Sequence, residues 1–212
     1  MRRLVCLCLV LVPAVVWAQN PKGATYITAE EVALVNKSPG VDRQIVNVDI
    51  GKSNLAVGVI HRARTAVPAA PNLTGAPPSA PPAPAAPPQP CGDKMPNVAS
   101  GSPTGIAHDG QTETYIIISG GGTLVTGGRI VNGRRSAPDS QVTQVLNGPS
   151  CSGVIVGDDV VRRVVKVGDI IIIPAGLPHG WMDIGDHVDY LSVRPDPDRT
   201  IPKLYTNPLL KR

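Results

Sequence analysis

The sequence contains no phenylalanine, and tyrosine and tryptophan bring its aromatic content to only 3%. Valine, isoleucine and leucine must therefore supply most of the hydrophobic core. Charged residues are also few, at 17%, and lysine and arginine form no dense run, so we expect no nucleic-acid partner. Glycine and proline are plentiful instead, with 22 and 23 residues. This composition favours many short strands joined by turns over helices.

The apolar run of residues 4–17 is too short to span a bilayer comfortably, since a membrane helix needs about 20 residues. It follows Arg2 and Arg3 and is followed by the small residue Ala18 before Gln19, a pattern typical of a secretory signal peptide. We therefore predict a signal peptide over residues 1–18 and an exported protein, periplasmic or secreted, without stable membrane insertion after cleavage. An uncleaved anchor is the alternative.

Cysteine is scarce as well. Two of the four cysteines lie within residues 1–18, which leaves Cys91 and Cys151 in the mature chain. An even number of cysteines in an oxidising compartment favours a disulfide. We predict a Cys91–Cys151 bond, and the alternative is two unrelated thiols.

The remaining chain, residues 19–212, is predicted to form a single domain. Thr28 and Glu31 have the spacing of a capping box and indicate a short N-terminal helix. Residues 44–50 and 55–61 follow as strands, and the second places Leu55, Val57, Val59 and His61 on one face. Residues 66–104 are rich in proline and alanine and cannot join a sheet ladder, so we predict an exposed insertion. The alternative is a linker between two domains.

Further strands are predicted over residues 112–119, 123–131, 154–167, 170–174 and 187–194. Gly120, Gly121 and Gly122 are interpreted as a hairpin turn, because a phosphate-binding loop would open a helix and strand signals continue here instead. So many short strands and turns indicate an antiparallel sandwich or a closed barrel.

The stretch GDIIIIPAGLPHGWMD, residues 168–183, combines four isoleucines with a turn and a histidine. The isoleucines predict a short strand buried on both faces. Pro174 and Gly176 then favour a tight turn, so the next strand should begin near His179. With a side-chain period of two, His179, Trp181 and Asp183 share one face of that strand.

The stretch IAHDGQTETYIIISGGG, residues 106–122, supplies partners for that histidine. Glu113, Tyr115 and Ile117 fall on one face, and His108 lies just upstream. Two histidines and one carboxylate inside a barrel would form an open facial triad, which suits a first-row metal with free positions for water or substrate. A carboxylate facing an apolar interior is also costly unless it is paired or bound to a metal.

These two stretches resemble the two motifs of the cupin superfamily. In the second motif Gly168, Pro174, Gly176 and His179 are in register, and Asp183 replaces the final asparagine. The first motif is degenerate: its leading glycine is displaced by one residue, to Gly101, and Ile106 stands where the first histidine should be. The positions of the first motif that match are His108, Glu113 and Gly120.

The resemblance implies an all-β fold, a double-stranded β-helix or jelly roll, with a metal in its mouth and with homodimerisation. His108, Glu113 and His179 would be the ligands, and His61 is a candidate for the missing fourth nitrogen or else a hydrogen-bonded rim residue. Tyr115 and Trp181 would line the pocket or pack in the core.

Our functional prediction is an exported cupin-type protein that binds one divalent transition metal, Fe, Mn, Zn or Ni, and acts as a small-molecule metalloenzyme. Oxygenase-like, isomerase or decarboxylase chemistry is compatible with such a site. The alternatives are a non-catalytic protein that binds a small ligand and has lost or weakened its metal site, and an envelope protein whose Pro/Ala-rich segment contacts the cell wall.

Overall fold

The computed structural model describes residues 23–65, 89–201 and 204–211. The predicted signal peptide and residues 66–88 of the predicted insertion lie outside the described residues. The elements in chain order are α1 (Ala29–Asn36), β1 (Asp42–Asp49), β2 (Asn54–Ala63), β3 (Pro90–Cys91), β4 (Thr104–His108), β5 (Glu113–Thr126), β6 (Arg129–Arg135), the π-helical turn η1 (Val142–Leu146), β7 (Ser150–Val156), β8 (Val161–Lys166), β9 (Ile170–Ile173), β10 (His179–Met182), β11 (His187–Asp196) and β12 (Tyr205–Thr206).

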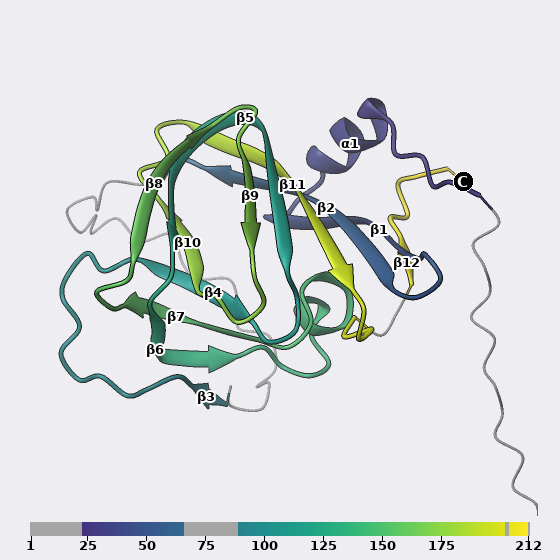
Figure 1. Cartoon of the computed structure of the whole chain (residues 1–212). Helices are drawn as coiled ribbons and strands as arrows, with labels where there is room; N and C mark the ends of the chain where they lie inside the picture. The colour runs from purple at the N-terminus through teal and green to yellow at the C-terminus, as the bar shows by residue number, and fades with distance from the viewer. Residues whose placement is uncertain (1–22, 66–88, 202–203, 212) are drawn as a thin grey trace, which may run out of the picture.

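The strands form two antiparallel sheets that share β5. One sheet has the order β12-β1-β2-β11-β5-β9, and the other has the order β8-β5-β10-β4-β7-β6-β3. The first half of β5 pairs with β9 and β11, and the second half pairs with β8 and β10. The strands therefore curve around a common interior, and α1 lies outside it (Figure 1). This is the predicted double-stranded β-helix with a short N-terminal helix.

The predicted hairpin turn at residues 120–122 is wrong, because β5 runs through these glycines without reversing. A Cβ at Gly120 would lie 2.0 Å from the carbonyl oxygen of His187 on β11, and the φ of Gly120 is +64°. Glycine is thus needed here for the close approach of two strands where β5 passes between the sheets. The strand ends later, at Thr126, and Gly127 and Gly128, which both have positive φ, separate β5 from β6.

The strand at residues 170–173 is confirmed, but its predicted burial on both faces is wrong. β9 pairs with β5 along one edge, and Ile170 and Ile172 are 64% and 69% exposed. Ile173, by contrast, is buried in the barrel interior. Four isoleucines in a row therefore form an edge strand with one buried side. Residues 154–167 also differ from the prediction, since they contain parts of two strands, β7 and β8, separated by a turn at Gly157.

Two apolar clusters pack on opposite faces of the first sheet, one inside the barrel and one outside it. The interior cluster comprises Ile60, Tyr115, Ile117, Leu124, Val165, Ile173, Ile184, Val188 and Tyr190. On the outside of the first sheet, Val35 of α1 packs with Ile45, Val46, Val59 and Leu210. The capping box that begins α1 is present, with Thr28 and Glu31 bonded reciprocally. Because α1 covers the outer face of β1 and β2, the opposite face of those strands points into the barrel.

Candidate metal centre

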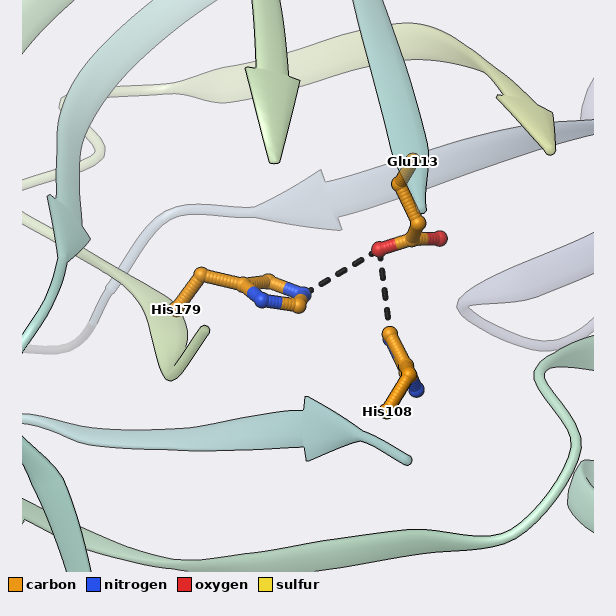
Figure 2. A group of neighbouring side chains, drawn as sticks. All are labelled: His108, Glu113 and His179. Atoms are coloured by element: carbon orange, nitrogen blue, oxygen red, sulfur yellow. Dashed lines mark ion pairs between the residues drawn. The ribbon is translucent and has the colours of Figure 1, made fainter. Parts of the chain in front are cut away.

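Three strand ends bring His108, Glu113 and His179 together. His108 ends β4, Glu113 begins β5 and His179 begins β10, and their side chains converge in Figure 2. All three are buried, with exposed fractions of 1–3%. One potential ligand atom from each lies within 4.8 Å of the others. The structure therefore assembles the three residues that the sequence predicted as metal ligands.

Backbone pairing explains why these strand ends meet. His179 pairs with Ile106 of β4 and also with Thr126 at the far end of β5. The turn before β10 is tied to the end of β4, since the Gly176 N–H donates to the His108 carbonyl oxygen at 2.7 Å. The Pro-Ala-Gly turn thus begins β10 beside His108.

The two ring nitrogens of His179 have different surroundings: one has a hydrogen-bond partner, and the other has none among the described residues. Its Nδ1 lies 3.0 Å from the carbonyl oxygen of Leu177, which can only accept, so Nδ1 carries a proton. In the neutral ring, Nε2 therefore presents a lone pair. This Nε2 is buried, has no hydrogen-bond partner, and lies 3.1 Å from Glu113 Oε2. Two electron-rich atoms that face each other in a buried site require a cation or a proton between them.

The two oxygens of Glu113 have different surroundings. Oε2 lies 3.2 Å from His108 Nε2 and accepts a hydrogen bond from the Tyr115 hydroxyl at 2.9 Å. Oε1 accepts from Arg194 Nε at 2.6 Å and from the Ser192 hydroxyl at 2.9 Å. Burial alone would raise the pKa of Glu113, but the charge of the Arg194 guanidinium beside Oε1 is the main cause that opposes burial, and this pKa lies well below its usual range.

The sequence patterns did not identify Arg194 as the partner of Glu113. The side chain is 1% exposed and also pairs with Asp42 at 2.7 Å. Burial would lower its pKa, but Asp42 and Glu113 raise it. The period-two alternation of Tyr190, Ser192 and Arg194 along β11, all buried, was the signal that could have placed it inside.

The structure does not bring His61 to the cluster. The predicted row of Leu55, Val57, Val59 and His61 does share one face of β2, but Val57 and Val59 pack outside the barrel against the α1 cluster. His61 Nδ1 lies 2.6 Å from Asp189 Oδ1, and its ring stacks on His187 at 6.0 Å. Its inward neighbours on β2 are Ile60 and Arg62. His61 is therefore a rim residue, and the structure places no nitrogen of it beside Glu113.

The two predicted pocket residues have different positions. Tyr115 is 3% exposed, and its ring contacts that of Tyr190 at a centroid distance of 4.3 Å. Trp181 donates its indole N–H to the Tyr190 hydroxyl at 3.2 Å, and it also lines a surface cavity with Arg64 and Ser102. Both therefore pack in the interior cluster. Asp183 lies beyond the end of β10, has a left-handed φ of +52°, and is exposed.

The Cys91–Cys151 disulfide is present, as predicted. Cys151 lies opposite Ala107 in the pairing of β7 with β4, and the next pair is Ser150 with His108. Cys91 belongs to β3, which pairs with β6, so the prediction that residues 66–104 cannot join a sheet ladder is wrong at Pro90–Cys91. The bond therefore joins the edge of the second sheet to β7, one strand away from His108.

The fold and this cluster define a class of protein: a double-stranded β-helix with a buried two-histidine, one-carboxylate group that could hold a metal ion. The donor set fits a divalent transition metal, because imidazole suits such ions and His179 Nε2 has no other partner. Within the part of the chain that the structure describes, no helix is long and apolar enough to cross a membrane.

No protein-family model matches the chain, and no curated protein matched it in a sequence search. Solved structures that it matches include oxalate oxidase in complex with glycolate, at 16% identity and a TM-score of 0.34. That match covers 82% of this chain and 58% of the oxalate oxidase chain, so this protein spans less than two thirds of its length.

Two further matches have fuller coverage of the solved structure. A Klebsiella pneumoniae protein with a double-stranded β-helix domain shows 16% identity and a TM-score of 0.38, over 84% of this chain and 94% of the other. The Drosophila melanogaster CENP-C cupin domain shows 10% identity and a TM-score of 0.30, over 71% and 70%. These two solved structures are thus described as a double-stranded β-helix domain and a cupin domain.

Proposed function

We propose that this protein binds one divalent transition metal ion through His108, Glu113 and His179, and that the loaded protein acts on a small molecule. The observation that carries the proposal is the Nε2 atom of His179. The Nδ1 atom of the same ring donates to the Leu177 carbonyl oxygen. Nε2 is buried, has no hydrogen-bond partner among the described residues, and lies 3.1 Å from a carboxylate oxygen of Glu113. A metal ion bound by both would satisfy the two atoms at once.

A bound metal would supply Lewis-acid chemistry to a small molecule that reaches its free positions. The protein contributes the orientation of the donors: the Leu177 carbonyl fixes the tautomer of His179, and Tyr115 holds Glu113 Oε2. Glu113 itself is 1% exposed, so its carboxylate has little contact with solvent. Oxygenase-like, isomerase and decarboxylase reactions are all compatible with such a site.

The first experiment is metal analysis by mass spectrometry of protein purified without chelator or nickel affinity. We expect near-stoichiometric metal in the wild type and loss of it in His179→Ala and Glu113→Gln. The matched control is His61→Ala, which removes a histidine from the outer face and should leave the metal content unchanged. A folded wild type that is metal-free and gains none on reconstitution with Mn, Fe, Ni or Zn would contradict the proposal.

A second candidate function is the binding of a small ligand without catalysis. Arg194 already compensates the charge of Glu113, and the three candidate ligands are at most 3% exposed, which favours a site that is stable without metal. The same metal analysis separates the two functions. If metal is present, turnover of small carboxylic acids and sugars under oxygen would be screened next.

We further propose that the protein is exported. The basic start and short apolar run of residues 1–18 support this, and so does the Cys91–Cys151 bond, because disulfides persist in oxidising compartments. N-terminal sequencing of protein from the periplasm or medium should begin at Gln19, whereas an intact Met1 in the membrane fraction would favour an anchor.

A further inference from the structure

Glu113 offers a bound metal only one of its two oxygens. Its Oε1 already accepts from Arg194 Nε at 2.6 Å and from the Ser192 hydroxyl at 2.9 Å. Its Oε2 is the atom that faces both histidines. A carboxylate held in this way can bind a metal through a single oxygen, unless Arg194 and Ser192 first release the other.

Arg194 is itself held in place by four elements of the fold. Its Nη1 donates to the Gln44 side-chain oxygen at 3.2 Å and to the Leu146 carbonyl oxygen at 3.1 Å. Its Nη2 donates to Asp42 Oδ2 at 2.7 Å. Because the guanidinium makes bonds to β1, β5 and η1 from β11 and is 1% exposed, it cannot swing away from Glu113 without breaking buried hydrogen bonds.

The charges of these groups act on a metal in opposite directions. The guanidinium lies beside Glu113 and repels an incoming cation, whereas the Asp42 carboxylate, which is bonded to Nη2 of the same guanidinium, attracts one. Two carboxylates and one guanidinium leave a net charge of −1 on Asp42, Glu113 and Arg194. Interactions between charges are stronger in a buried site than in water, so this balance must change metal affinity.

We propose that Arg194 and Asp42 form a positioning pair that sets both the metal affinity and the denticity of Glu113. Arg194 keeps the carboxylate to one metal-binding oxygen and lowers affinity, and Asp42 offsets part of that effect. The inference rests on the proposed metal site. It predicts a centre that binds its metal reversibly and that leaves the fold intact when the metal is removed.

The test is titration of each purified, metal-free protein with Co²⁺, followed by absorbance and calorimetry, with melting temperatures measured in chelator. Arg194→Met removes the charge at similar length and should bind Co²⁺ at least about tenfold more tightly, because the repulsion is lost and only the Ser192 hydroxyl still holds Oε1. The Co²⁺ absorption spectrum should also change, because the coordination of the carboxylate changes from one oxygen to two.

Asp42→Asn should have the opposite effect, with Co²⁺ binding weaker by about threefold or more, because one attracting charge is lost. Its side chain is partly exposed, at 17%, so this variant keeps the proposal testable if Arg194→Met fails to fold. Ser192→Ala is the matched control: it removes a hydrogen bond to Oε1 without changing any charge, and should alter affinity by less than either charge variant.

Opposite shifts in Arg194→Met and Asp42→Asn would support the positioning pair, and shifts of the same sign, or none, would overturn it. If the wild type binds no Co²⁺ but Arg194→Met does, the pair is supported and the proposed function of the native site is wrong. If the wild type binds Co²⁺ and no variant differs from it, the proposed function holds and the positioning pair is wrong. If neither the wild type nor any variant binds Co²⁺, the proposed function and the positioning pair are both wrong.

Discussion

The buried Glu113–Arg194 pair and an exposed pair elsewhere in the chain allow a direct comparison of the same chemistry in two environments. Glu113 and Arg194 are each 1% exposed, whereas Asp49 and Arg199, which also form an ion pair, are 32% and 42% exposed. Removing one partner of a buried pair leaves an uncompensated charge in an interior of low dielectric constant, which lowers stability. Removing one partner of a solvent-exposed pair has little such cost, because water solvates the remaining charge.

We therefore expect Glu113→Gln to lower the free energy of unfolding by about 2–4 kcal/mol in chelator, somewhat less than for an isolated buried pair because Asp42 still compensates Arg194. Asp49→Asn should cost less than about 1 kcal/mol. Urea denaturation of both variants provides the measurement. Equal losses in the two variants would show that Glu113 is less enclosed than the structure indicates.

At the scale of single elements, β9 illustrates how far a local pattern predicts burial. Four isoleucines predict a strand correctly, because branched side chains suit an extended backbone. They do not reveal which strands lie beside it. β9 pairs with β5 on one edge, and within the described part of the chain Ile170 and Ile172 on its outward face are exposed.

Ile172 and Ile173 are adjacent residues with opposite environments, 69% and 1% exposed. Ile173→Ala should lower the free energy of unfolding by about 2–4 kcal/mol, because it removes buried methylene groups and leaves a cavity in the interior cluster. Ile172→Thr should change it by less than about 0.5 kcal/mol and keeps a branched residue in the strand. A large loss in Ile172→Thr would indicate that another surface covers β9 in solution.

The three consecutive glycines of β5 also show that a local pattern can indicate the wrong structure. Three consecutive glycines are a common turn signal, and the sequence contains nothing to show that Gly120 instead allows β11 to approach. That role becomes visible only when His187 is placed, 2.0 Å from where a Cβ would lie.

At the scale of the whole molecule, the disulfide closes a long loop. Cys91 and Cys151 are separated by 60 residues, and the closed segment contains β4, β5, β6 and η1. Restricting an unfolded loop of this length is worth roughly 4 kcal/mol in the chain-entropy model. The bond also secures β7, which supports the strand that carries His108.

Reduction, or the double substitution of both cysteines by serine, should therefore lower the free energy of unfolding by about 2–4 kcal/mol and decrease the melting temperature. The free energy of metal binding should change less than the free energy of unfolding, because the disulfide does not contact the three candidate ligands. Thermal and urea unfolding with and without reductant provide the measurement. An unchanged midpoint on reduction would mean that the bond does not form in the purified protein.

The sequence by itself determined the local parts of the candidate site. A tight turn at Pro174 and Gly176 starts a strand at His179, and a period of two places Glu113 and Tyr115 on one buried face. These features follow from backbone and side-chain preferences of neighbouring residues, so they can be derived without knowing the fold. The same preferences predicted an antiparallel sandwich or a closed barrel, and the double-stranded β-helix was implied by the resemblance to the cupin motifs.

Only the tertiary structure decided the features that depend on distant residues. Arg194 bonds to Glu113 across 81 residues of sequence, and no local pattern encodes that partner. His61 lies outside the barrel because α1 packs on the other residues of its own face, a choice that depends on the packing of separate elements. Alternation along a strand identifies two faces, but the packing of helices and sheets determines which face is inside.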